Sequence, residues 1–151
     1  MRGRIKIGFS HIGGIYIGKE IQTDEHLHHA ITVAVSFSEK FDYWCEKQKL
    51  SCTGVVIQAN TTRKFVNSHK THIGFIHIEP FSEQGLMLIN KKEPFKQLTL
   101  LQVKNIIELL ENWFSDGQND EDKTTQVITD IIAEIGSSSN VKIDERIKGY
   151  G

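Results

Sequence analysis

The sequence of 151 residues has little of three things: charge of one sign, long apolar runs and cysteine. The formal net charge is −1 with 25% charged residues, so the basic excess of a chain that holds nucleic acid is missing. No apolar run approaches the roughly 18 to 20 residues needed to cross a bilayer, and no secretory-type apolar block follows the first four residues. We therefore expect a cytoplasmic protein that makes no membrane contact and does not bind DNA through this chain.

The two cysteines, Cys45 and Cys52, stand on either side of an expected turn at residues 47–48. Across a two-residue turn they would be diagonal neighbours about 7 Å apart, which is too far for an easy disulfide. We interpret them as reduced thiols, in keeping with a cytoplasmic protein.

The short motifs of familiar enzymes are also missing. The sequence contains no Gly-x-Ser-x-Gly, no phosphate-binding loop of the Walker type and no dinucleotide fingerprint. Neither cysteine has basic neighbours that would mark it as a nucleophile. Nothing in the sequence argues for catalysis, and we expect the protein not to be an enzyme.

What the sequence does contain is a succession of short apolar runs separated by polar turns, from Asp24 to Phe81. The most strand-like run is 29–37, where β-branched residues recur on alternate positions as in a half-buried strand. Residues 5–21 predict two strands joined by a turn at Gly13-Gly14. Further strands are expected at 41–45, 50–58, 64–66 and 72–79. This spacing, in a chain long enough for one domain, predicts a mainly β fold that forms a small barrel or sandwich.

From residue 98 onward the apolar period changes from 2 to 3.6. Residues 98–114 predict a helix, and 123–135 predict a second helix that ends before Gly136 and packs antiparallel to the first. The remaining segments are expected to be a short helix or turn at 82–90, a charged loop at 91–96, a flexible linker at 136–140 and the start of a third helix at 144.

The first helix carries two apolar stripes, and one of them is expected to stay uncovered in a monomer. Ile106, Leu109 and Trp113 can face the β-core or the second helix. The other stripe keeps a 3-4 spacing over about two heptads, which suits a packed helix seam. We therefore predict a homodimer held through Leu100, Val103, Ile107, Leu110 and Phe114.

His26 and His28 have the His-x-His spacing in which two imidazoles can share a metal, as in cupin-type barrels. A complete site of that kind needs a carboxylate soon after the second histidine and another histidine on a later strand. Thr32 and Val33 stand at the first place and Arg63 at the second, where a cation repels a metal. We expect no metal and no cofactor. Three further histidines are expected to be ordinary solvated residues: His69, His72 and His77.

Four short stretches follow one another along the chain: Tyr16-Ile-Gly18, His26-x-His28-His29-Ala30, Gly54-Val-Val-Ile57 and Ile76-His-Ile-Glu-Pro80. In their order and spacing they resemble the N-terminal domain of AraC-type transcriptional regulators, over about residues 13–148. The sequence departs from that family at two places. Gln58-Ala59-Asn60 replaces a turn of the Pro-Pro-Gly type, and Arg63 replaces the histidine after it.

The resemblance implies a cupin-like β-barrel or jelly roll at 1–96 that senses a small-molecule effector, followed by a helical dimerisation arm at 97–136. It also implies that 137–151 is a linker and the start of the connection to a DNA-binding domain absent from this chain. The residues expected at the effector are His28, Thr32, Tyr43 and Arg63, between strand 28–37 and hairpin 41–52. A sugar, an acid or an aromatic molecule would suit such a site equally well.

Two other functions fit the same sequence. One is a small metal-dependent cupin enzyme, which metal analysis of the purified protein would detect. The other is a stand-alone jelly-roll binding module, which is favoured if the natural reading frame stops at residue 151.

Overall fold

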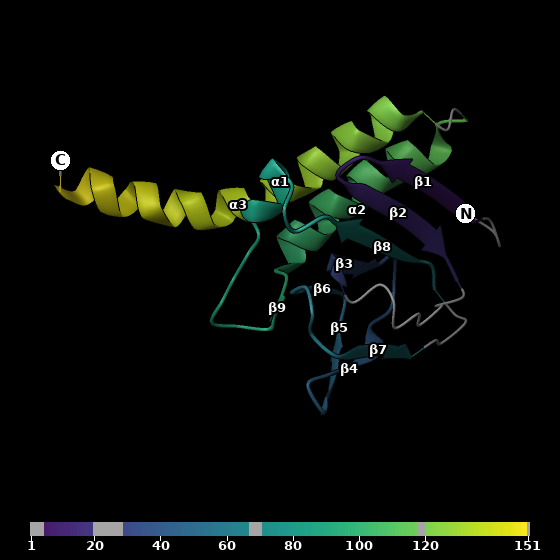
Figure 1. The fold of residues 1–151 in the computed structure, drawn as a ribbon, viewed down its shortest axis with the longest axis horizontal. Helices are drawn as coiled ribbons and strands as arrows, with labels where there is room; N and C mark the ends of the chain where they lie inside the picture. The colour runs from purple at the N-terminus through teal and green to yellow at the C-terminus, as the bar shows by residue number, and fades with distance from the viewer. Residues whose placement is uncertain (1–4, 20–28, 67–70, 118–119, 151) are drawn as a thin grey trace.

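The computed structural model describes residues 5–19, 29–66, 71–117 and 120–150. In these ranges the chain forms two antiparallel β-sheets followed by two long helices (Figure 1). The expectation of a mainly β fold with C-terminal helices is therefore confirmed. The sheets are separate, because within the described ranges no strand of one sheet pairs with a strand of the other.

The larger sheet has the strand order β1-β2-β8-β3-β6-β9. Its strands are β1 at Lys6–Ser10, β2 at Gly13–Gly18, β3 at Ile31–Ser36, β6 at Gly54–Ile57, β8 at Ile73–Ile78 and β9 at Phe95–Gln97. The smaller sheet has the order β5-β4-β7, with β4 at Phe41–Cys45, β5 at Gln48–Cys52 and β7 at Arg63–Val66. The helices are α1 at Glu83–Leu86, α2 at Leu100–Ser115 and α3 at Glu121–Tyr150.

Strands β3 and β8 lie at the centre of the molecule because the larger sheet is covered on both faces. The smaller sheet packs on one face through side chains such as Phe41 and Phe65, and α2 and α3 pack on the other (Figure 1). All six residues of β3 are consequently buried, whereas the sequence indicates a half-buried strand. The alternation along 29–37 reflects the pleat, but it does not reveal that both faces have a cover.

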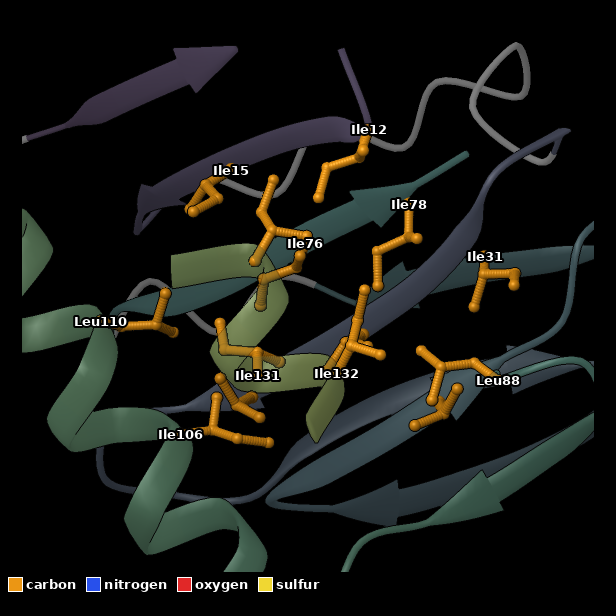
Figure 2. Close-up of a cluster of buried hydrophobic side chains, with 14 of the residues drawn as sticks. Ile12, Ile15, Ile31, Ile76, Ile78, Leu88, Ile106, Leu110, Ile131 and Ile132 are labelled. Atoms are coloured by element: carbon orange, nitrogen blue, oxygen red, sulfur yellow. The ribbon is translucent and has the colours of Figure 1, made fainter. Parts of the chain in front are cut away.

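We call the apolar cluster between the larger sheet and the helices the helix-side core. Figure 2 shows its sheet residues, among them Ile15, Ile31, Ile76 and Ile78, meeting Ile106 and Leu110 of α2 and Ile131 and Ile132 of α3. All of these side chains are almost completely buried. Burying an aliphatic side chain of this size contributes roughly 1.5 to 3 kcal/mol, so the helices and the larger sheet stabilise one another.

The predicted dimerisation stripe of α2 is partly covered within a single chain. Leu110 is buried in the helix-side core and Val103 is buried beside Gly54 of β6, so the expectation that they stay uncovered in a monomer is wrong. Ile107 and Phe114 are partly buried against the same core, while Leu100 is 80% exposed. The reason is that α2 contacts both the sheet and α3, so both of its apolar stripes find partners. Homodimer formation itself stays a prediction.

Helices α2 and α3 pack antiparallel, as predicted. Near one end of the pair, Asn105 Nδ2 donates to Glu134 Oε1 at 2.8 Å. Near the other end, the Trp113 indole N–H donates to Thr124 Oγ1 at 3.2 Å. The first hydrogen bond joins the start of α2 to a later part of α3, and the second joins the end of α2 to the start of α3.

Helix α3 does not end near Ile135. The predicted linker at 136–140 and the separate helix from 144 are both wrong, because one helix continues to Tyr150. Glycine in a helix costs about 1 kcal/mol relative to alanine and serine costs less, and neither blocks a helix as proline does. Extending an existing helix also avoids the cost of a new nucleus. The C-terminal part of α3 projects beyond the sheets (Figure 1).

Three strand predictions also differ from the structure. The single strand expected at 50–58 is two strands, β5 and β6, which belong to different sheets. The turn between β1 and β2 is at His11 and Ile12, and Gly13 already belongs to β2. A β carbon on Gly13 would lie 1.9 Å from the His77 carbonyl oxygen, so this glycine permits a close approach of two strands. The predicted charged loop at 91–96 is wrong at its end, because residues 95–97 form β9, which pairs with β6 at the sheet edge.

Candidate functional site

A polar cluster lies in the otherwise apolar space between the two sheets. Thr32 on β3 and His77 on β8 are opposite each other in the larger sheet. Arg63, the first residue of β7, reaches Thr32 from the smaller sheet. The fold therefore brings together two of the predicted ligand-binding residues, Thr32 and Arg63, and adds His77 to them.

Three oxygen atoms orient the Arg63 guanidinium. Its Nε donates to the Thr61 carbonyl at 3.0 Å, and its Nη2 donates to the Gln58 carbonyl at 2.6 Å. Its Nη1 donates to the Thr32 hydroxyl. Burial lowers the pKa of Arg63 to about 10, so the group remains a cation at neutral pH. The cluster therefore presents a positive charge in a fixed orientation.

The Thr32 hydroxyl connects Arg63 to His77. Its oxygen accepts from Arg63 and lies 3.2 Å from Nδ1 of His77. The direction of this second hydrogen bond depends on the imidazole tautomer, because the hydroxyl can donate its one proton to Nδ1 or accept from Nδ1–H through its second lone pair. Burial, and secondly the charge of Arg63, lower the pKa of His77 to about 4, so the imidazole is neutral at neutral pH.

The interpretation of His77 as a solvated residue is wrong. Its ring is stacked on Phe75, with centroids 6.3 Å apart and planes 7° from parallel. The feature that assigns it to the site is its position opposite Thr32, which depends on the pairing of β3 with β8. Two strands separated by about forty residues of sequence carry no local signal of that pairing.

His72 is not solvated either. It is buried, and its ring packs edge-on against Phe37 and Phe114. His69, the third histidine of that prediction, lies outside the described residues.

The turn between β6 and β7 borders the cluster. The carbonyls of Gln58 and Thr61 that hold Arg63 come from this turn, and Asn60 within it has a left-handed backbone with φ of 60°. Asn60 Oδ1 lies 3.2 Å from Nδ1 of His29, just ahead of β3. This is the turn at which the sequence departs from the AraC-type pattern. His28, also predicted to bind the ligand, lies outside the described residues.

Tyr43 is not brought into the polar cluster. Its ring is fully buried among Phe41, Phe65 and Phe95 in the apolar layer between the sheets. Its hydroxyl has no hydrogen-bond partner of ordinary geometry in the described part of the chain. Burial raises the pKa of this phenol to about 12. The prediction that Tyr43 shares the site with Thr32 and Arg63 is therefore not supported by its position, since the ring is part of the aromatic packing between the sheets.

Both cysteines are free and buried in the same layer. The hairpin turns at Glu46 and Lys47, which have left-handed φ values of 49° and 69°, one residue earlier than expected. Cys45 is therefore opposite Gln48, and Cys52 is opposite Phe41. Burial raises the pKa of both thiols, that of Cys45 to about 11. Both thiols are therefore protonated at neutral pH, and neither is activated as a nucleophile.

Among the residues that the structure describes, no group of three or more His, Cys, Asp or Glu side chains is placed to hold a metal ion. His26 and His28, the pair with metal-ligand spacing, fall outside that part. No helix in the described ranges combines the length and the apolar character needed to cross a membrane.

Comparison with known proteins gives no assignment, because no family model matches the chain and a search of the curated proteins finds no significant match. The chemistry of the site therefore has to be argued from the geometry around Arg63, Thr32 and His77.

Proposed function

We propose that this chain is the effector-sensing and dimerisation domain of an AraC-type transcriptional regulator, in which DNA is bound through a C-terminal domain outside this chain. The observation that carries the proposal is the guanidinium of Arg63, held in a fixed orientation beside Thr32 and His77 in an apolar space between two sheets. An oriented charge in such a space is suited to recognising a small molecule.

The architecture supports the same proposal. The stretches that carry the family resemblance coincide with strands: Tyr16–Gly18 lies in β2, Gly54–Ile57 is β6, and Ile76–Ile78 lies in β8. An antiparallel helix pair follows the sheets, as expected for a sensing domain of this kind. We propose that the two facing sheets are the walls of a cupin-like barrel.

The effector that fits this chemistry best is a small organic acid. The Arg63 guanidinium is a cationic hydrogen-bond donor, and a carboxylate offers acceptor oxygens with a charge that matches it. The rings of Phe65 and Phe75, with centroids 4.9 Å apart, line the same layer and would pack against an apolar part of the ligand.

The test is a panel of small carboxylic acids and their matched amides, measured by thermal shift and then by calorimetry. The variant is Arg63→Met, and the control is Lys64→Met, its exposed neighbour on β7. An acid that stabilises the parent should stabilise the Lys64→Met control equally. We expect Arg63→Met to bind it at least about tenfold more weakly, as removal of one charge-assisted contact implies.

The opposite results are equally clear. If folded Arg63→Met binds the acid as tightly as the parent, or if only the amides bind, the proposed acid effector is wrong. The regulatory role is tested separately with the complete gene product. The acid should change its affinity for its own promoter DNA, and an unchanged affinity would argue for a binding module without a role on DNA.

The dimer belongs to the same proposal, now without Val103 and Leu110 as interface residues. Sedimentation of this chain at tens of micromolar measures it directly. A monomer at that concentration would contradict a dimer formed by this chain alone.

A further inference from the structure

A cavity lies on the other face of the larger sheet from the polar cluster. Its volume is about 570 Å³, and it forms where the α1–β9 connection, the beginning of α2 and α3 near Gly136 come together beside β6. Figure 1 shows α1 and α2 close to the middle of α3 on this side of the molecule. The proposed function does not use this cavity.

The wall nearest the protein interior is apolar. Val56 and Leu88 belong to the helix-side core, and Leu98 and Ile135 pack against that core from the two ends of the cavity. A ligand that covered these side chains would remove apolar surface from water, which is worth roughly 25 cal/mol for each Å².

The rim on the solvent side is basic. Lys91, Lys92 and Lys96 line the cavity together with a single carboxylate, Glu93. All four are exposed, so three lysine side chains and one carboxylate surround the apolar wall. The lysine charges favour an anionic head group near the mouth of the cavity.

Hydrogen bonds hold this rim to the sheet. Gln58, at the end of β6, donates from Nε2 to the Leu88 carbonyl at 2.9 Å and accepts at Oε1 from the Asn90 N–H at 3.1 Å. The Asn90 side chain in turn accepts from the N–H groups of Lys92 and Glu93, at 2.9 and 3.1 Å. The backbone that carries two of the rim lysines is therefore fixed relative to the apolar wall.

We infer that this cavity binds an amphipathic anion, a soluble molecule with a carboxylate or phosphate head and an unbranched apolar body. The volume falls within the roughly 300 to 1,000 Å³ of typical ligand pockets. A neutral apolar molecule would leave the lysine rim without a partner, and a small inorganic anion would leave the apolar wall uncovered. Only a ligand with both parts satisfies both surfaces. This inference does not depend on the regulator proposal.

The first test blocks the apolar part. The probes are decanoate and decyl phosphate, kept monomeric and titrated calorimetrically into the intact chain. A β carbon on Gly136 would be 3.9 Å from Met87 Cε, a lining atom, so Gly136→Leu places a side chain in the cavity without a backbone clash. The control Ala133→Leu adds the same side chain at an exposed position of α3. We expect Gly136→Leu to weaken both probes at least about tenfold and Ala133→Leu to change neither.

The second test reverses the charge of the rim. The variant carries Lys91→Glu, Lys92→Glu and Lys96→Glu. Its control makes the same change of net charge at exposed lysines of the β4–β5 turn and the smaller sheet: Lys47→Glu, Lys49→Glu and Lys64→Glu. We expect the rim variant to weaken both probes at least about tenfold and the control to weaken them by less than about twofold. Acetate and inorganic phosphate should not compete.

Four results would overturn the inference. Loss of decanoate binding in Arg63→Met, with binding retained in the rim variant, would locate the ligand between the sheets. Unchanged affinity in folded Gly136→Leu would exclude the cavity. Equal weakening by the two charge-reversal variants would mean a general effect of net charge. Binding to anionic phospholipid vesicles without binding to monomeric decanoate would mean that the lysines contact a membrane surface.

Discussion

At the scale of single residues, burial decides which members of the polar cluster carry charge. It lowers the pKa of Arg63 to about 10 and that of His77 to about 4. At neutral pH the first is therefore a cation and the second is neutral. Two basic groups that share Thr32 as a hydrogen-bond partner can lie together because only one of them is charged.

We predict that His77 makes the protein less stable as the pH falls from 6.5 towards 4. Its pKa in the folded state is below the 6.5 of an unperturbed histidine, so in this interval the unfolded chain binds more protons and acid favours unfolding. The effect is about 2 kcal/mol at pH 5 and about 3 kcal/mol once the folded state is also protonated. Urea unfolding at the two ends of the range measures it.

The matched variant for this measurement is His77→Gln, which keeps a polar side chain opposite Thr32 but does not titrate. It should lose less stability than the parent between pH 7 and pH 5. An equal loss in both proteins would assign the effect to another group.

Tyr43 gives a prediction of the opposite kind, in which removing a polar atom does no harm. Its hydroxyl is buried without a partner of ordinary geometry in the described part of the chain. An unsatisfied buried hydroxyl costs free energy. Tyr43→Phe should therefore raise the free energy of unfolding, by up to about 1 kcal/mol, in chemical denaturation. A decrease of similar size would mean that the hydroxyl makes a stabilising bond, for example to Gln97 or Cys52.

The candidate site shows what can be predicted for single residues. Thr32 and Arg63 are identifiable from the sequence because each stands where a metal-binding cupin would have a ligand. His77 is not, because it belongs to the site through the register of β3 and β8. Tyr43 lies between the sheets, but its ring is surrounded by aromatic side chains and is not part of the polar cluster.

At the scale of elements, α2 docks on the larger sheet at a glycine. A β carbon on Gly54 would lie 2.5 Å from Val103 Cγ2 and 3.2 Å from Leu98 Cδ1. Val103 is buried and has little room to move. The missing side chain of β6 is thus what allows the start of α2 to approach the sheet.

We predict that Gly54→Ala destabilises the protein by about 1 to 3 kcal/mol through overpacking. Val103→Ala removes the methyl group that the new side chain would meet. The two substitutions together should therefore cost less than the sum of their separate costs. Denaturant unfolding of the four proteins of this cycle measures the difference, and strict additivity would mean that Gly54 and Val103 are not in contact.

The stripe on α2 yields a second prediction for this helix. Leu110 is fully buried in the helix-side core, whereas Leu100 at the start of the helix is exposed. Leu110→Glu should unfold the protein, because a buried carboxylate without a partner costs several kcal/mol. Leu100→Glu should leave the circular dichroism and the thermal midpoint unchanged. A folded Leu110→Glu variant that is monomeric, from a dimeric parent, would restore the dimer seam predicted from the sequence.

Periodicity identifies the elements of this chain better than their ends. Predicted helix 98–114 corresponds to α2 and strand 72–79 to β8, because each has a long and regular apolar pattern. The three-residue strand β9 has no such pattern, and it can be recognised only from its pairing with β6. The sequence predicts that α3 ends before Gly136, and this is wrong because residues that weaken a helix do not have to end it.

At the scale of the whole molecule, the larger sheet is shared by two apolar layers. The layer toward the smaller sheet contains Phe41, Phe65 and both cysteines, and the layer toward the helices contains Trp113 and the isoleucines in Figure 2. Loss of either layer would expose one face of β3 and β8. The sequence predicts a division at residue 96, but these shared strands couple the two sides of that division.

We predict that both layers unfold in one transition, because loss of either cover exposes one apolar face of the strands β3 and β8 that both layers share. Each layer contains a side chain that can report its unfolding. Both cysteines lie between the sheets, and Trp113 of α2, one of the two tryptophans, lies in the helix-side core. In a Trp44→Phe background, which removes the exposed tryptophan of the smaller sheet, urea should change the fluorescence of Trp113 and the reactivity of the thiols at the same midpoint. Thiols that react at a lower urea concentration would mean that the smaller sheet opens by itself. A change in Trp113 before the thiols react would mean that the helices are an independent arm, and the division at residue 96 would then describe two cooperative units.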